Sequence, residues 1–447
     1  MARYFVTAVL VFFVLSSFCQ TETAQLDLLV SRYAKLNRFN GSVLIAKGGN
    51  ILLNKGYGYR NVASKITNDE NSIFQLGSIT KQFTTAVILK LQQEKKLNVT
   101  DKLSKYFPKF PKGDSITIEQ LMLHTSGIYS YTSDSKFMET EVSKPANREK
   151  MMALFKDKPL DFSPGKGWNY SNSGYSMLGY IIEKVTKMPY EQVVRQYIFS
   201  PLQMTHSGFD FTHLQSPEKT TGYFKIDNKS ADTAPIVDSS VSFSAGAIYS
   251  TVGDLYKWHQ ALENYTILSE ADQEKAYTPV RNHYGYGWGI DSIDGKRKVG
   301  HSGGIHGYIT NFVRVPEDDI CIVLLSNASD KSLEEITDKV LKQLYNKPYD
   351  LPKLKTALIL TDSILKQYEG TYEIRPDLKV VMSIKNGALN AAPTNQSVKV
   401  LSAEKEDSFF DPNDNVQVEF VKNFKNEVEG FLLFQGGRKI FCRKLKE

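Results

Sequence analysis

One stretch of the chain reads Phe74-Gln75-Leu76-Gly77-Ser78-Ile79-Thr80-Lys81-Gln82-Phe83, where a glycine and a serine lead into a long segment with helical apolar spacing. Ser78 and Lys81 are three residues apart, so on a helix the hydroxyl and the ammonium share one face. A serine needs a neighbouring base of this kind to act as a nucleophile. The stretch therefore predicts a reactive serine at the mouth of a helix.

The same spacing of serine and lysine occurs elsewhere in the chain, so context has to identify the reactive serine. The other occurrences begin at Ser133, Ser163, Ser216, Ser363 and Ser402. Two of these serines are followed directly by proline, two lie in polar stretches, and one falls near a predicted domain junction. Only Ser78 opens a long apolar-periodic segment, so Ser78 is the best-placed candidate. The alternative is a plain helix-capping serine with a solvated lysine.

The remaining pattern predicts an α/β (α+β) protein with an antiparallel sheet flanked by helices. Helical spacing covers residues 26–39, 175–185 and 333–345, and β-like runs cover 42–46, 51–54, 284–290, 298–304, 309–315 and 320–326. After the proline-marked segment 348–360 the pattern changes to short strands with hairpin turns, notably Asn386-Gly387 and Gly436-Gly437. We therefore expect a large first domain at 20–347, a linker at 348–360 and a small all-β, barrel-like domain at 361–447.

Composition excludes several classes of protein. The chain has 447 residues, of which 41% are hydrophobic and 23% charged, as in a globular protein with a sizeable core. Its net charge of +6 is spread along the sequence, which argues against a nucleic-acid partner. Beyond residue 19 only Cys321 and Cys442 remain, too few for a disulfide framework or a metal cluster, so both are expected to be buried. We expect no metal and no cofactor.

The N-terminus predicts export. Met1-Ala2-Arg3 precede an apolar run over residues 4–15 and then Ser16-Ser17-Phe18-Cys19, which matches the three zones of a signal peptide at 1–19. No run approaches the roughly 18 apolar residues of a transmembrane helix. We expect a periplasmic or extracellular protein. A lipoprotein anchored at Cys19 ranks second, because Phe18 stands where that motif wants a small residue.

Three short elements in a fixed order carry the chemistry. They are Ser78-Ile79-Thr80-Lys81, Tyr170-Ser171-Asn172 and His301-Ser302-Gly303, placed at a helix start, in a loop before a helix and in a strand. Each is weak alone, since Tyr-x-Asn and His-x-Gly also occur elsewhere in the chain. Lys81 and Tyr170 are both candidate bases for Ser78, because either could lose its proton in a cleft, and the residues leave the choice open.

With these elements, residues 26–347 resemble the serine penicillin-binding proteins and class C β-lactamases, together with their D-aminopeptidase and esterase relatives. The resemblance implies a β-lactamase/transpeptidase-like fold with an all-helical lobe and an acyl-enzyme at Ser78. It further implies that Asn172 bonds Lys81 and the substrate amide, that the backbone N–H groups of Ser78 and Gly304 form the oxyanion hole, that His301 orients Tyr170 or the substrate, and that Ser302 and Gly303 contact substrate.

The same resemblance suggests the substrate. The third element is His301-Ser302-Gly303 rather than the Lys-Thr-Gly of class C β-lactamases, a form associated more with DD-peptidases, D-aminopeptidases and esterases. We expect a small peptide, ester or lactam substrate, and most of all a D-amino-acid peptide. An esterase, a β-lactamase and a non-catalytic binder of penicillin or peptidoglycan peptides are the alternatives. His124, at a predicted helix end, is expected to bind a backbone carbonyl rather than to act in catalysis.

Overall fold

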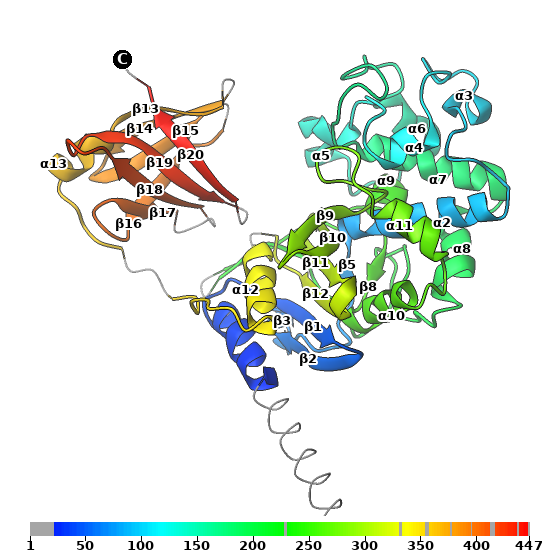
Figure 1. Ribbon diagram of the computed structural model, residues 1–447, viewed down its shortest axis with the longest axis horizontal. Coiled ribbons are helices and arrows are strands. Elements are labelled where there is room, and N and C mark those ends of the chain that lie inside the picture. The colour runs from blue at the N-terminus through cyan, green and yellow to red at the C-terminus, as the bar shows by residue number, and fades with distance from the viewer. Residues whose placement is uncertain are drawn as a thin grey trace, which may run out of the picture. The chain divides into compact units, whose positions relative to one another are not determined.

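The computed structural model (Figure 1) divides the chain into two compact units, residues 1–329 and 330–447. The structure describes residues 22–227, 230–329, 333–353, 357–375, 378–394, 396–411, 416–435 and 438–445. The predicted signal peptide at 1–19 lies outside these residues, so export stays a prediction, as do the sequence-based domain boundaries. Within the described residues no helix has the length and apolar character needed to cross a bilayer.

A six-stranded antiparallel sheet organises the first unit. Its strands are β1 (Gly41–Lys47), β2 (Asn50–Tyr57), β9 (Gly289–Ile293), β10 (Lys296–Ile305), β11 (Tyr308–Val315) and β12 (Ile320–Ser326), in the spatial order β2-β1-β12-β11-β10-β9. The first hairpin therefore lies beside the last one, with Gly41 opposite Ser326. All of β12 is buried, as its unbroken apolar run predicts. The prediction of a strand from residue 284 was wrong, because residues 284–288 form turns and β9 begins at Gly289.

Helices make up most of the rest of the first unit, and four of them pack against one another (Figure 1). These are α2 (Thr80–Gln93), α4 (Ile118–Met122), α7 (Asn172–Thr186) and α9 (Ser239–Gly246). The α2 helix packs against both α7 and α9, and it is buried almost all round, so it is the central helix of the unit. Its apolar residues belong to one core cluster that also includes the sheet residues Val299, Phe312 and Leu325.

Shorter elements complete the first unit. A helix covers residues 22–35, and α10 (Val252–Glu263) packs on β12 and is capped by the Thr251 hydroxyl. The others are β3 (Tyr59–Asn61), β4 (Ile66–Thr67), β5 (Phe74–Gln75), α3 (Leu103–Tyr106), α5 (Ser135–Thr140), α6 (Arg148–Ala153), α8 (Tyr190–Val194), β6 (Tyr223–Ile226), β7 (Ala231–Thr233), β8 (Tyr249–Ser250) and α11 (Glu270–Ala276).

The second unit contains a closed eight-stranded antiparallel barrel, which confirms the predicted all-β module. The helices α12 (Glu334–Leu344) and α13 (Asp362–Leu365) precede β13 (Gly370–Arg375), β14 (Leu378–Lys385), β15 (Ala388–Pro393), β16 (Lys399–Ala403), β17 (Ser408–Phe410), β18 (Val416–Lys422), β19 (Val428–Gln435) and β20 (Arg438–Lys444). Asn386 and Gly387 join β14 to β15 with φ values of 55° and 70°, as the Asn-Gly signal predicts. The turn at Gly436-Gly437 lies outside the described residues.

Aromatic side chains fill the barrel. Tyr368 stacks on Phe420 with ring centroids 4.2 Å apart, and Tyr372, Phe409 and Phe431 pack around that pair. Aromatic pairs bury large apolar areas and stabilise a small core beyond simple area burial. The two cysteines, Cys321 in the sheet and Cys442 in the barrel, are both buried and unpaired, as predicted.

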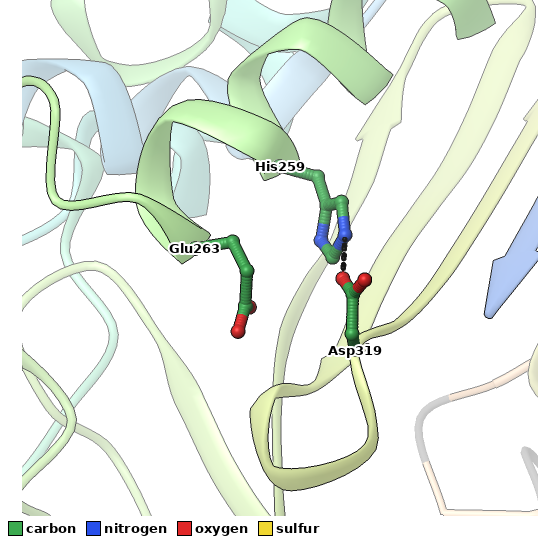
Figure 2. Close-up of side chains that lie close together, drawn as sticks. All are labelled: His259, Glu263 and Asp319. Carbon is green, nitrogen blue, oxygen red and sulfur yellow. Dashed lines mark hydrogen bonds and ion pairs between the residues drawn. The ribbon is translucent and has the colours of Figure 1, made fainter. Parts of the chain in front are cut away.

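A buried charge network joins α10 to the turn before β12. His259 and Glu263 lie one turn apart on α10, and Asp319 faces His259 from the turn (Figure 2). The Arg314 guanidinium, which is fully buried, donates to His259 Nδ1 at 2.9 Å and to Glu263 at 2.6 Å. His259 Nε2 is then the N–H donor to Asp319, at 2.9 Å. The side chains of His259, Glu263 and Asp319 are close enough together to hold a cation. Arg314, however, already supplies a positive charge beside them.

We predict that this network makes stability depend on pH. Burial and the neighbouring Arg314 lower the pKa of His259 from 6.5 to about 4. His259 is therefore protonated near pH 6.5 in the unfolded chain but only near pH 4 in the folded chain. The unfolding free energy consequently falls as the pH drops through this window, by about 3 kcal/mol at most.

Urea unfolding between pH 7.5 and 4 would measure this loss, with His259→Gln as the matched control. The variant has no group that titrates at this position, so its unfolding free energy should fall less over the same window. Equal losses in the two proteins would contradict the prediction.

Candidate active site

Ser78 lies in a single 3₁₀ turn, η1 (Gly77–Ile79), directly before α2. The preceding Leu76 fixes this turn, because its N–H donates to Ile248 O at 2.8 Å and its carbonyl accepts from Thr310 Oγ1 at 2.7 Å. Gly77 has a φ of +57°, and a Cβ there would stand 2.9 Å from the backbone nitrogen of Gly304 on β10. A glycine is therefore needed to bring the serine against the sheet. No side chain caps η1 or α2, so the capping alternative for Ser78 is wrong.

The Ser78 hydroxyl has two side-chain partners. Lys81 Nζ lies 2.9 Å from Ser78 Oγ, and the Tyr170 hydroxyl lies 2.8 Å from the same oxygen. Ser78 is partly exposed, whereas Lys81 is completely buried. A small molecule can therefore reach the serine oxygen, while water is kept from the lysine.

The other two neighbours of Lys81 indicate its protonation state. Its Nζ donates to Asn172 Oδ1 and to the Ala245 carbonyl, both at 2.8 Å. Burial lowers the pKa of Lys81 well below 10.5, and no carboxylate among the described residues forms an ion pair with it. A neutral amine has two hydrogens, which these two oxygens accept, so its lone pair is left for the Ser78 hydroxyl.

The pKa of Tyr170 is shifted in the opposite direction from that of Lys81. Burial raises the pKa of its hydroxyl above 10, although the Ser78 hydrogen bond opposes this shift. Tyr170 therefore keeps its proton and donates it to Ser78 Oγ. A hydroxyl that donates to the nucleophile is suited to deliver a proton later, rather than to remove one first.

A strained residue presents the Ala245 carbonyl to Lys81. Phe243, inside α9, has a φ of 39° and a ψ of −134°, which a non-glycine residue rarely adopts. Its ring is held by Tyr180 and Tyr190, with centroids 5.1 Å away in each case. This acceptor could not be predicted from the sequence, because a backbone carbonyl leaves no signal in the residue types.

Asn172 is fixed from several sides at the start of α7. Its Oδ1 accepts from Lys81, and its Nδ2 donates to Thr132 Oγ1 at 3.0 Å. The Asn172 backbone N–H donates to Ser130 Oγ at 3.1 Å. One hydrogen of Nδ2 remains available for another acceptor. Sequence analysis missed Ser130 and Thr132, because they lie in a polar loop without a recognisable pattern.

His124 packs on Tyr170 but does not bind a carbonyl as predicted. Its Nδ1 accepts the Ser171 backbone N–H at 3.1 Å, and its ring centroid is 4.2 Å from that of Tyr170. Its own carbonyl accepts the Asn169 N–H at 3.1 Å. Burial lowers the pKa of His124 well below 6.5, so the ring is neutral. His124 thus positions the loop that carries Tyr170.

His301 lies on β10 beside the cluster. Its Nδ1 is 2.5 Å from the Ser302 carbonyl and its Nε2 is 2.9 Å from the Tyr284 hydroxyl, so its hydrogen bonds go to these residues rather than to Tyr170. Burial lowers the pKa of His301 to about 4. The neutral ring therefore carries its hydrogen on Nδ1 and accepts from Tyr284. Sequence analysis missed Tyr284, because it assigned that residue to a strand.

The end of β10 forms one wall of the site. Gly303 is buried, and a Cβ there would lie 1.9 Å from the Leu76 carbonyl, so only glycine permits this approach. Ser302 and Gly304, on either side, are exposed. The backbone nitrogen of Gly304 thus comes next to the turn that contains Ser78, and the oxyanion hole expected from these two N–H groups stays a prediction.

Comparison with known proteins gives this geometry a family. The Beta-lactamase family model matches residues 26–346. Penicillin-binding protein 4* of Bacillus subtilis (strain 168) is 29% identical over 446 residues, which cover 94% of this chain and 98% of the relative.

Solved structures agree. A penicillin-binding protein homologue from Pyrococcus abyssi, described as octameric, has a TM-score of 0.67 at 26% identity and covers 94% of this chain and 99% of its own. A D-stereospecific amidohydrolase from Streptomyces sp. has a TM-score of 0.59 at 26% identity, over 72% of this chain and 97% of its own. The match over residues 26–346, with a serine, lysine and tyrosine joined at its centre, shows that the chain belongs to the Beta-lactamase family of serine hydrolases.

Proposed function

We propose that the protein hydrolyses an amide bond next to a D-amino acid, through an acyl-enzyme at Ser78. The observation that carries this proposal is the accessible Ser78 oxygen held between Lys81 Nζ at 2.9 Å and the Tyr170 hydroxyl at 2.8 Å. The D-stereospecific amidohydrolase from Streptomyces sp. supports the substrate class. The His301-Ser302-Gly303 element, which lacks the lysine of class C β-lactamases, supports a peptide or amide over a lactam.

Acylation begins with the proton of Ser78. Lys81 takes that proton, so the Oγ–H bond breaks while an N–H bond forms, and Oγ attacks the substrate carbonyl carbon. The carbonyl oxygen gains the negative charge and is stabilised by the N–H groups of Ser78 and Gly304. The free hydrogen of Asn172 Nδ2 can donate to a carbonyl oxygen of the bound substrate.

The leaving group departs with a proton from Tyr170. The C–N bond breaks, its electron pair stays on nitrogen, and the Tyr170 hydroxyl supplies the proton. Tyr170 then regains a proton from the Lys81 ammonium, which restores the neutral amine. In the second half of the cycle water attacks the ester carbon and gives a proton to Lys81. The C–Oγ bond then breaks, and Ser78 Oγ takes that proton back from the Lys81 ammonium as the acid is released.

The first prediction concerns the nucleophile. A fluorescent penicillin or an activated ester should label the purified protein, and Ser78→Ala should abolish both labelling and hydrolysis, because the Ser78 oxygen is the one hydroxyl that bonds both Lys81 and Tyr170 in the described part of the chain. Mass spectrometry of the labelled peptide measures the outcome. Ser163→Ala is the matched control, since Ser163 also precedes a lysine by three residues. A label that survives in Ser78→Ala would contradict the proposal.

The second prediction separates the base from the acid. If Lys81 is the base, activity rises with pH through its lowered pKa, well below 10.5. Tyr170→Phe should keep this acid limb of kcat/KM while losing about 10²–10⁴ in rate. Lys81→Met should show no such limb. Rate–pH profiles with an activated ester provide the measurement, and a Tyr170→Phe variant without an acid limb would instead make Tyr170 the base.

A substrate panel tests the proposed class. D-amino-acid amides and peptides ending in D-Ala-D-Ala should be hydrolysed faster than their L counterparts, and faster than a cephalosporin. Short-chain esters belong in the same panel, because an ester is easier to cleave and reports acylation without stereochemical choice. A preference for L substrates, or turnover of lactams or esters alone, would overturn the assignment to D-amino-acid amides.

A further inference from the structure

Lys81 Nζ lies over the faces of two tyrosine rings. The ring centroid of Tyr170 is 4.8 Å away and that of Tyr175 is 5.1 Å away. Tyr170 already has a role in the proposed function, whereas Tyr175 does not. Tyr175 is on α7, fully buried, one turn beyond Asn172.

The Tyr175 ring is held rigidly in this place. Its hydroxyl donates to the Met122 carbonyl at 2.8 Å, and its backbone carbonyl accepts from Ser244 Oγ at 2.8 Å. The His124 ring packs on it with a centroid distance of 5.1 Å. The ring face is therefore turned to Lys81 by contacts at both ends of the residue.

Proton transfer from Ser78 places a positive charge on Lys81, which the surrounding groups have to stabilise. When Lys81 takes the Ser78 proton, its amine becomes an ammonium in a site from which water is excluded. The titratable groups around it are the hydroxyls of Tyr170 and Tyr175 and the imidazole rings of His124 and His301. Neither imidazole ring carries a charge. No carboxylate among the described residues forms an ion pair with Lys81. Aromatic faces attract a desolvated cation through the ring quadrupole.

We propose that Tyr175 is a further catalytic residue, whose ring face stabilises the ammonium that Lys81 becomes on accepting the Ser78 proton. The bonds that change are those of the proposed function, Ser78 Oγ–H breaking and Lys81 N–H forming, so the inference rests on Lys81 acting as the base. The hydroxyl of Tyr175 takes no part in the step, because it is committed to Met122.

A fluorinated series at this position tests the role of the ring. Tyr175 is replaced by phenylalanine, 4-fluoro-, 3,5-difluoro- and 3,4,5-trifluorophenylalanine, which keep nearly the same shape while the negative charge on the ring face declines. A weaker ring face lowers the pKa of Lys81. The acid limb of Ser78 acylation by an activated ester should therefore move to lower pH stepwise, by about half to one and a half pH units across the series. The acylation rate at the plateau should fall in parallel, because Lys81 becomes a weaker base.

The same series at Tyr308 is the control. Tyr308 is also fully buried, and its hydroxyl donates to a backbone carbonyl, that of Thr220, at 2.9 Å. Fluorination there should leave the acid limb in place. An acid limb that ignores fluorination at Tyr175, or that moves equally at both positions, overturns the proposal while acylation itself upholds the proposed function. Absence of acylation in the unaltered protein would overturn both.

Discussion

A buried lysine with no carboxylate partner among the described residues is the constraint on which the rest of the site depends. Taking a charged amine out of water is costly, so burial lowers the pKa of Lys81 well below 10.5, and its polar atoms have to be matched by oxygen atoms in fixed directions. Those oxygen atoms come from three separate parts of the chain: the turn before α2, the start of α7 and the bend in α9. The site is therefore only as precise as the packing of these three elements.

The fold meets this requirement by making α2 its central helix. Thr84 and Thr85, one turn beyond Lys81, bond the Ser244 carbonyl on α9 and the Tyr286 carbonyl before β9. Glycines on β10 allow the sheet to approach the serine turn from the other side. Packing of the Phe243 ring on Tyr180 and Tyr190 offsets the free-energy cost of the strained Phe243 backbone. The same contacts therefore stabilise the fold and position the reactive groups, so a substitution that weakens one weakens the other.

Much of this architecture could be predicted from the sequence. The apolar periods predicted most of the sheet strands and α2, and two of the three short motifs contain Ser78, Lys81, Tyr170 and Asn172, which the structure brings together. What could not be predicted depends on tertiary contacts. Tyr284 was assigned to a strand although Gly285 and Gly287 turn the chain there. The acceptor at Ala245 is a backbone atom, and His124 binds an N–H that only the folded loop presents.

The closed barrel has a consequence for how the chain is made. Its ring is sealed by β20 pairing with β13, with Tyr372 opposite Lys444. A ribosome delivers β13 first and β20 last of these eight strands, so β13 has an open edge until β20 emerges. In the sheet that supports Ser78, β1 likewise waits for its partner β12, but β12 is synthesised before any strand of the barrel. The first unit can therefore fold while strands of the barrel are still being synthesised. A chain that ends before β20 leaves the edges of β13 and β19 unpaired and prone to aggregation.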